Sequence, residues 1–257
     1  MGDSDPRSFY EKLTTMVPAD HYVFMNHGYF DETEGEPAVH EGFHPVHRYS
    51  VAFIEFLFRG IELEGKDLLE IGTGRGGNLS YAVKYGGVRS ATGVDLSDGN
   101  IRFCQRVHSL PNMTFVQSSA DDLPFDDASF DVALNLESSH SYPDVPKFFA
   151  EALRVVRPGG TFLYADNIFE DRIEHYRNAV ETSGFEIVSY QEITPKVERA
   201  MKANREPLEA YLKSMIDPEL DNEAFVLRLI NGFNVRVYEM YRDRHAIFGF
   251  WHLKKPE

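Results

Sequence analysis

A short polar segment follows one of the apolar runs of this chain and carries several groups suited to acid–base chemistry. Residues 135–144 read "NLESSHSYPD", directly after the apolar run "FDVAL". A histidine such as His140, with an unperturbed pKa of about 6.5, accepts a proton close to neutral pH. Glu137 is placed to orient His140 or to hold a substrate hydroxyl. The alternative is structural, with His140 packing at the start of a helix that begins near Pro143 and Asp144.

A glycine-rich run, "LLEIGTGRGGNLS", carries a second kind of chemistry. Gly72, Gly74 and Gly77 match the pattern G-x-G-x-x-G, in which glycines let a ligand approach the backbone and the first amides of the next helix. The ligand is either a dinucleotide or an adenosyl sulfonium cofactor, whose ammonium group would need a nearby acid such as Glu70. Asp95, at the end of the next strand, is expected to bind the ribose hydroxyls of either ligand.

Oxygen ligands for Mg²⁺ are present as well. Glu137, Asp166 and Asn167 would come from the loops after two neighbouring strands, and Mg²⁺ prefers such hard oxygen ligands. The segment "YADN" also resembles the metal-binding segment of catechol O-methyltransferases. We favour the simpler interpretation that Asp166 caps the following helix, so Mg²⁺ is not expected to be required.

Short apolar runs alternate with amphipathic runs from residue 66 onward, and this alternation predicts the framework that positions these groups. It is typical of an α/β fold with a doubly wound, mostly parallel, seven-stranded sheet. We predict strands at residues 66–72, 90–96, 113–119, 130–137, 161–166, 184–193 and 245–253. We predict core helices at residues 78–86, 97–109 and 144–156. Ser97 or Asp98 should cap the second of these helices, and "RPGG", with Pro158, should end the third.

Two further regions should cover the site. Residues 1–60 form a mostly helical N-terminal segment, in which "HYVFMNHGYF" is expected to fold over the cofactor. Residues 61–194 form the α/β core, residues 195–243 a helical insertion that acts as a substrate lid, and residues 244–257 a final edge strand. The lid's inner face is predicted to carry Phe225, Phe233 and Tyr238. Insertions of this kind often cover the carboxyl ends of the strands, where ligands bind.

Composition excludes several functions. The 257 residues carry a formal net charge of -15, which disfavours binding to the phosphates of nucleic acids. The longest apolar run, "VAFIEFLF", is too short to span a bilayer, and the first residues lack a signal-peptide pattern. We therefore expect a cytoplasmic protein with a small-molecule partner, no nucleic acid and no membrane span. The sequence leaves a homodimer open.

Four segments in order, "LLEIGTGRGG", "GVDLS", "LPFDDASFDVALNLESSHSYPD" and "VVRPGGTFLYAD", resemble the class I S-adenosylmethionine-dependent methyltransferases, whose fold is Rossmann-like. More narrowly, "VFMNHGYF", "ESSHSYPD" and "YAD" are similar to phthiotriol and phenolphthiotriol dimycocerosate methyltransferases, which belong with actinobacterial O-methyltransferases of polyketide-derived lipids and natural products. The resemblance implies cofactor contacts at Glu70, Gly72, Thr73, Gly74, Gly76, Asp95, Leu96 and the backbone of Asn135.

One motif departs from that family. Ser118, Ser119 and Ala120 stand where the family usually has Gly-Asp-Ala, whose aspartate binds the adenine amine. A serine is a weaker acceptor than an aspartate. Asp121 is therefore expected to substitute, beside Ser119 and Ala120.

Together these features predict an O-methyltransferase that uses S-adenosylmethionine on a hydroxyl of an apolar small molecule in secondary metabolite biosynthesis. His140 would be the general base, with Glu137 beside it. The alternatives are an NAD-dependent oxidoreductase and a catalytically silent cofactor-binding protein. The acceptor is expected to contact Tyr22, Asn26, Tyr29, Ser139 and Tyr142.

Overall fold

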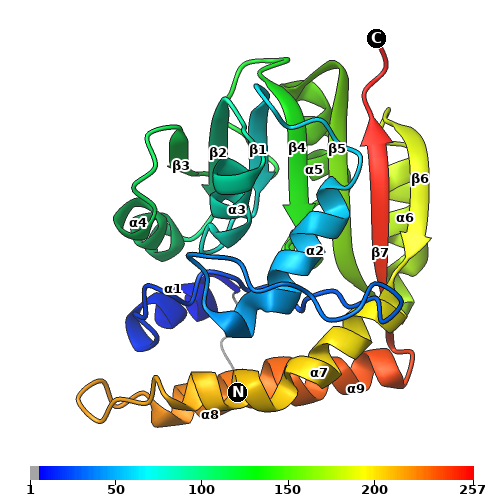
Figure 1. The fold of residues 1–257 in the computed structure, drawn as a ribbon. Coiled ribbons are helices and arrows are strands. Elements are labelled where there is room, and N and C mark those ends of the chain that lie inside the picture. Colours follow the sequence, from blue (N-terminus) through cyan, green and yellow to red (C-terminus); the bar gives the residue numbers. More distant parts are fainter. Residues whose placement is uncertain (1–5) are drawn as a thin grey trace.

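A seven-stranded sheet forms the centre of the molecule, as a computed structural model of the chain shows (Figure 1). The model describes the backbone of residues 6–257, and the side chains of that range except those of residues 6, 7, 233 and 234. The order of the strands across the sheet is β3-β2-β1-β4-β5-β7-β6. The strands are β1 (Asp67–Ile71), β2 (Ser90–Asp95), β3 (Met113–Gln117), β4 (Phe130–Leu136), β5 (Val156–Phe169), β6 (Glu186–Glu192) and β7 (Ala246–Lys254).

The predicted α/β fold is confirmed, but the final strand is not at the edge. Strands β1 to β5 run parallel, whereas β7 pairs antiparallel with both β5 and β6. The prediction that residues 244–257 form an edge strand is therefore wrong. Burial agrees with this order: the residues of β7, "AIFGFWHLK", are mostly buried, as expected for an interior strand, whereas those of β6, "EIVSYQE", are almost entirely exposed.

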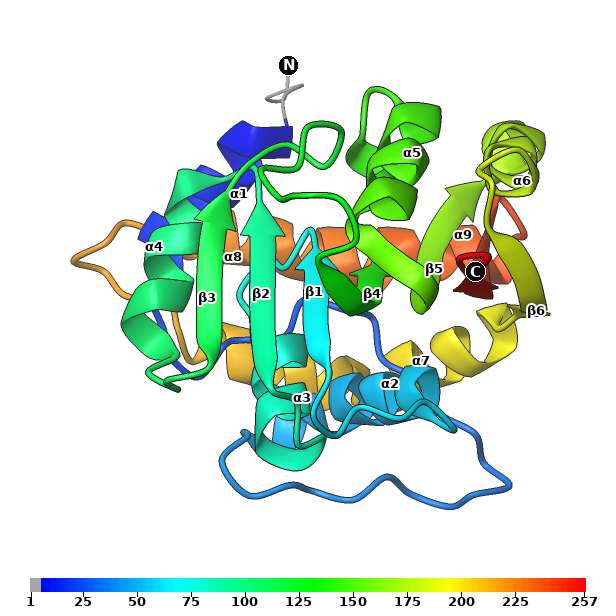
Figure 2. The same cartoon turned by 90° about the horizontal axis from the view of Figure 1, so that it is seen from above.

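Helices cover both faces of the sheet (Figure 2). Helices α2 (Arg48–Phe58), α3 (Gly77–Tyr85) and α4 (Asp98–Val107) contribute to one apolar cluster with residues of the sheet. Helices α5 (Val145–Val155) and α6 (Ile173–Glu181) contribute to the other. Each helix buries an apolar stripe of the kind its sequence period predicts.

Two local signals were expected to set helix boundaries, and one of them does so. Ser97 caps α4 by accepting a hydrogen bond from the backbone N–H of Asn100, as predicted. The segment "RPGG" does not end α5 as expected, because α5 stops at Val155 and β5 begins at Val156. Instead, Pro158 and Gly159 lie in an irregular stretch of β5, where the register with β4 shifts and Gly159 has a φ of +72°.

A layer of helices lies under the carboxyl ends of the parallel strands (Figure 1). It contains α1 (Pro6–Met16), α7 (Thr194–Lys213), α8 (Glu223–Ile230), a π-helical turn (Asn231–Arg236) and α9 (Val237–Arg242). Leu13 and Val17, at the end of α1, pack with Leu212 of α7 and Val226 of α8 in a third apolar cluster. The N-terminal helix and the helices between β6 and β7 thus meet in one cover over the edge of the sheet where ligands bind in such folds.

Candidate active site

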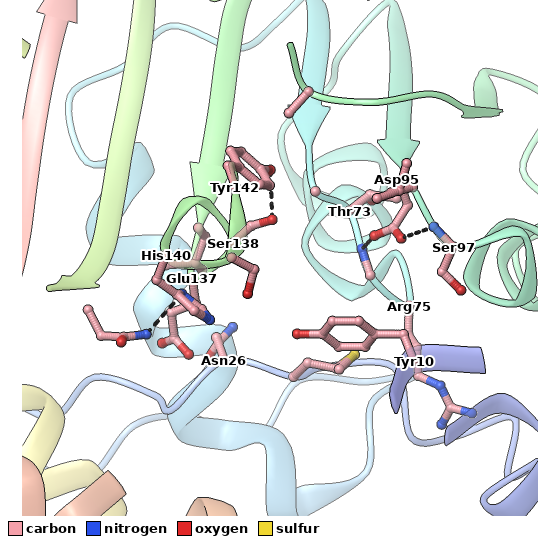
Figure 3. Close-up of a pocket in the computed structure, with 18 of the residues that line it drawn as sticks. Tyr10, Asn26, Thr73, Arg75, Asp95, Ser97, Glu137, Ser138, His140 and Tyr142 are labelled. Carbon is pink, nitrogen blue, oxygen red and sulfur yellow. Dashed lines mark hydrogen bonds between the residues drawn. The ribbon is translucent and has the colours of Figure 1, made fainter. Parts of the chain in front are cut away.

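A cavity of about 530 Å³ lies between the carboxyl ends of the strands and the helical cover (Figure 3). Its walls come from the loops after β1, β2, β3 and β4, from the end of β5, from α1 and residues 23–27, and from α9. The volume is in the range of small-molecule and cofactor sites. Both predicted sets of functional residues, after β1 and after β4, therefore meet in one space.

The glycine loop after β1 is shaped for close approach. Gly72, Gly74 and Gly76 all have positive φ values, and Gly76 is the left-handed residue directly before α3. A Cβ on Gly72 would lie 1.9 Å from the Oγ of Ser138, in the loop after β4. The glycine at position 72 therefore allows the two loops to approach each other at the cavity wall.

Asp95 joins this loop to the end of β2. Its carboxylate accepts hydrogen bonds from the backbone N–H groups of Gly74 (2.8 Å) and Ser97 (2.9 Å) and from the side chain of Asn100 (3.2 Å). Burial raises the pKa of this carboxyl, while those hydrogen bonds act in the opposite direction. Asp95 and its neighbour Leu96 both line the cavity, and their contacts with the ribose and the adenine stay predictions.

Glu70 supports the loop from behind and does not line the cavity. Its carboxylate accepts from Thr73 Oγ1 (2.7 Å) and Asn78 Nδ2 (2.6 Å), and burial raises its pKa to about 7. Asn135 is also behind the wall, where its Nδ2 donates to the carbonyl of Ile71 at 2.7 Å. Gly76 likewise lies outside the lining, whereas Gly72, Thr73 and Gly74 belong to it.

The segment after β3, where the sequence departs from the family's Gly-Asp-Ala motif, lies at the cavity. Ser118, Ser119, Ala120 and Asp121 all line the cavity, and the hydroxyl of Ser119 donates to the carboxylate of Asp121. Asp121 can therefore present an acidic group where the family motif has its aspartate.

These features fit S-adenosylmethionine. The glycine loop offers space where a side chain would collide with its neighbours, and Asp95 offers carboxylate oxygens in a position suited to vicinal hydroxyls. Gly72, Thr73 and Gly74 would hold the methionine side, Asp95 the ribose, and Leu96 with Ala120 and Asp121 the adenine.

His140 forms a pair with Asp166 at the other end of the cavity. The Nδ1 of His140 lies 2.8 Å from Oδ1 of Asp166, and the backbone N–H of His140 donates to Oδ2 at 3.0 Å. Asp166 is fully buried, whereas the side chain of His140 is 25% exposed and lines the cavity. Burial lowers the pKa of His140, but the charge and hydrogen bond of Asp166 outweigh it and raise that pKa above 6.5.

Asp166 does not cap a helix, contrary to the favoured interpretation. Strand β5 continues to Phe169 because it pairs with β7 along its whole end, from Asp166↔Gly249 to Phe169↔Ala246. Ser139 reinforces the pair from outside the cavity, since its hydroxyl donates to Oδ2 of Asp166 at 2.6 Å. Ser139 is thus a buried support and does not line the cavity where an acceptor would lie.

Glu137 binds a different histidine from the one expected. Its carboxylate accepts from the backbone N–H of His27 (2.9 Å), and Oε2 lies 2.9 Å from Nδ1 of the same residue. Glu137 also has a φ of +51°, which is uncommon for a non-glycine residue. Glu137 therefore connects the N-terminal segment to the loop after β4, and it does not orient His140.

The proposed Mg²⁺ ligands do not converge. The carboxylate of Glu137 faces His27, while that of Asp166 faces His140 and Ser139. Within the described part of the chain, no group of three or more His, Cys, Asp and Glu side chains is arranged to hold a metal ion. The geometry gives the trio of Glu137, Asp166 and Asn167 no common binding point.

Only some of the residues predicted to contact the acceptor line the cavity. Asn26 and Tyr142 line the cavity, but Tyr22 and Tyr29 do not. Tyr22 lies 5.3 Å from the guanidinium of Arg75, and Tyr29 stacks on Phe56 with the ring centroids 4.2 Å apart. Both tyrosines therefore contribute to packing under the cover.

The residues by which the helical insertion lines the cavity differ from those predicted. Phe225 stacks on Phe9, and Tyr238 lies outside the lining, while the side chain of Phe233 lies outside the described residues. The lining from this region consists of Val237, Met240 and Tyr241.

Several lining residues were not found from sequence, among them Tyr10, Met25 and Phe169. The segment around Tyr10, "PRSFYEKLTTM", reads as an ordinary amphipathic helix in which nothing distinguishes Tyr10 from Phe9. Met25 and His27 lie in the segment that was expected to cover the cofactor, so their region was predicted although their roles were not.

No helix in the described range is long and apolar enough to cross a membrane.

Known proteins resemble this chain in sequence and in fold. The family model described as a methyltransferase domain matches residues 69–164. Over 196 residues, covering 76% of each protein, the chain is 38% identical to "Probable phthiotriol/phenolphthiotriol dimycocerosates methyltransferase 2" of Mycobacterium ulcerans (strain Agy99). It is 36% identical to the fatty-acid O-methyltransferase of Mycolicibacterium smegmatis (strain ATCC 700084 / mc(2)155) over 201 residues, which cover 78% of this chain and 73% of that protein.

Among solved structures, the [4+2]-cyclase SpnF matches with a TM-score of 0.75 at 17% identity, covering 98% of this chain and 96% of that one. At this identity the likeness concerns the fold alone. The sequence relatives decide between the two ligands that the glycine pattern left open, in favour of S-adenosylmethionine. The chain belongs to the class I S-adenosylmethionine-dependent methyltransferases, and S-adenosylmethionine is its cofactor.

Proposed function

We propose that this enzyme methylates a hydroxyl group of a largely apolar small molecule, with His140 as the general base. The observation that carries the proposal is the pair formed by His140 and Asp166, which places a histidine of raised pKa at the wall of the cavity. A neutral hydroxyl is a weak nucleophile near neutral pH, so a base that removes its proton accelerates attack. An acceptor that is already ionised would have no need of such a base.

Asp166 determines which nitrogen of His140 acts. A carboxylate can only accept, so the 2.8 Å contact fixes the proton of the neutral ring on Nδ1 and leaves Nε2 as the basic nitrogen. Asn167 Nδ2 lies 3.2 Å from the same Nδ1, a longer contact to an uncharged group, and does not change this assignment. The buried Asp166 then stabilises the imidazolium that forms when Nε2 takes the proton of the acceptor.

Methyl transfer breaks one bond, forms one bond and moves one proton. Bound S-adenosylmethionine supplies a methyl group on a sulfonium; the S–C bond breaks as the new O–C bond forms, and the electron pair remains on sulfur. The acceptor hydroxyl loses its proton to His140. The chain contributes proximity and alignment by holding both partners in one cavity under a cover that excludes water.

The acceptor end of the cavity is largely apolar, and its described lining offers no free Lys or Arg side chain. Leu136, Val237, Met240, Tyr241 and Phe169 line it. The single basic Lys or Arg side chain of the described lining is Arg75. Its guanidinium turns away to donate to the carbonyls of Tyr22 and Val17.

This lining favours an uncharged acceptor over a carboxylate. An ionised carboxylate would lose solvation here without gaining a Lys or Arg partner, and the carboxylate of Glu137 lies nearby. The two relatives are named for lipid substrates, which agrees with an apolar acceptor for this chain, and a secondary metabolite is the class we propose.

A matched acceptor panel tests the proposal. The protein is incubated with methyl-labelled S-adenosylmethionine and nonylphenol, dodecanol, dodecanoic acid or dodecylamine, and products are identified by mass and by the chemical shift of the new methyl group. We expect methyl ethers from the phenol or alcohol. Methylation of the acid or amine alone would contradict the proposal. Tight binding of S-adenosylhomocysteine without turnover of any acceptor would favour the silent cofactor-binding alternative.

A further inference from the structure

Helix α1 brings a tyrosine into the active-site cavity from outside the α/β core. Tyr10 lines the cavity together with residues of the glycine loop and of the loop after β4. In Figure 3 its ring lies between Asp95 and Thr73 on one side and Ser138 and His140 on the other. Its hydroxyl points toward the side where Asn26, Glu137 and His140 lie.

The helix that carries Tyr10 is docked onto the cofactor-binding loops. Glu11, the next residue, accepts hydrogen bonds from the hydroxyl of Ser97 (3.2 Å) and the backbone N–H of Gly99 (3.4 Å) at the start of α4. At the far end of α1, the buried guanidinium of Arg75 donates to the carbonyls of Val17 and Tyr22. The position of α1 is therefore set by the loops that follow β1 and β2, the two loops that carry the glycine cradle and Asp95.

The phenol itself is equipped for a ligand. Within the described residues its hydroxyl has no hydrogen-bond partner, while its ring packs edge-on against Phe9. Burial raises the pKa of Tyr10, and the charges of Asp95, Asp166 and Glu137 raise it further. The hydroxyl accordingly stays protonated, and it can donate a hydrogen bond to an oxygen placed between the two halves of the cavity.

We propose that Tyr10 contacts both reactants, its ring covering the bound cofactor and its hydroxyl donating to the acceptor oxygen that His140 deprotonates. One lone pair of that oxygen accepts from Tyr10, the other attacks the methyl group, and the proton goes to Nε2 of His140. Because Tyr10 closes the space next to Asp95, α1 must move away before the cofactor can leave. The contact between the ring and the cofactor requires only that the chain is a methyltransferase. The contact between the hydroxyl and the acceptor rests, in addition, on the proposed function.

Dissociation of S-adenosylhomocysteine, measured by surface plasmon resonance, tests the ring. Tyr10→Ala should speed dissociation by about tenfold, since a buried aromatic contact is lost, and Tyr10→Phe should stay within about threefold of the parent. Tyr238→Ala is the matched control, because Tyr238 packs against the core from the same helical cover but outside the cavity. Amide exchange in residues 6–16 should slow when S-adenosylhomocysteine binds to the parent, and this protection should be lost in Tyr10→Ala.

Turnover tests the hydroxyl separately. With nonylphenol, Tyr10→Phe should lower kcat by about tenfold, the typical effect of losing one positioned hydrogen bond. An unchanged kcat would remove the hydroxyl from the mechanism. If the parent methylates neither nonylphenol nor dodecanol, the proposed function fails, but the dissociation rates still decide the contact of the ring. If Tyr10→Ala lowers only the melting temperature, as Tyr238→Ala would, Tyr10 is a packing residue and the inference is wrong.

Discussion

Two histidine–carboxylate pairs contribute to the same cavity, and they connect different parts of the molecule. His140 pairs with Asp166, so that the loop after β4 is bound to the neighbouring strand β5. His27 pairs with Glu137, so that the same loop is bound to the N-terminal segment. The first pair lies within the α/β core, while the second joins the core to its cover.

The difference indicates a division of labour. A base must be held in a fixed position relative to the reacting atoms, and a fully buried partner on a strand of the sheet provides that rigidity. A cover must open and close, so its attachment is better made by a contact that can be broken and reformed. We infer that the pair with Asp166 serves the chemistry and the pair with Glu137 serves closure, although both place imidazoles at one cavity.

The largest effect is expected at the first pair. His140→Gln keeps a hydrogen-bonding side chain but has no useful basicity, so kcat should fall by about 10²–10⁴-fold. Binding of S-adenosylhomocysteine, measured by calorimetry, should change little, because the predicted cofactor contacts lie at the other end of the cavity. A variant that keeps its kcat but melts earlier would show that His140 supports the start of the next helix.

Asp95 provides the next largest effect and marks the cofactor end of the cavity. Asp95→Ala should weaken S-adenosylhomocysteine binding by about 2–4 kcal/mol, well over tenfold, through loss of charge-assisted hydrogen bonds. Asp98→Ala is the matched control, because Asp98 is an acid of the same segment that pairs with Arg102 on the surface. Equal affinities for the two variants in calorimetry would place the ribose elsewhere.

A smaller and different effect is expected at the second pair. Glu137→Gln should cost about 1–2 kcal/mol of contact between the loop and the N-terminal segment, and amide exchange in residues 21–30 should become faster. Because Glu137 makes no hydrogen bond to His140 and acts on it only through its charge, kcat should stay within about threefold of the parent. Glu34→Gln, which removes an exposed ion pair with Arg59, should change neither property and serves as control. A loss of kcat as large as that of His140→Gln would abolish the distinction between the pairs.

The sequence predicted the parts of the fold that depend on local signals. The periodicity located the strands of the sheet, and Ser97 was recognised as a cap because capping depends on one residue and its immediate neighbours. The glycine loop and Asp95 were recognised because closely spaced glycines and a carboxylate directly after a strand both indicate a bound ligand.

Long-range pairing accounts for what the sequence did not reveal. The partner of His140 is Asp166, 26 residues away, and only the parallel pairing of β4 with β5 brings them together. Glu137 lies nearer to His140 in sequence, but its backbone turns it toward His27, 110 residues away. Tyr10 enters the cavity from a helix whose docking no local pattern encodes, and β7 lies inside the sheet because its strand neighbours are set by the topology.

The pH dependence of kcat/KM tests the central claim most directly, with the parent, Asp166→Asn and His140→Gln compared on one acceptor from the panel. A base acts only when neutral, so the rate of the parent should fall as the pH drops through the raised pKa of His140, which lies above 6.5. Asp166→Asn removes the charge that raises this pKa while burial continues to lower it, so the acid limb should move to lower pH as the maximal rate falls. In His140→Gln the limb should be absent. An acid limb that keeps its position in all three proteins would contradict His140 as the base.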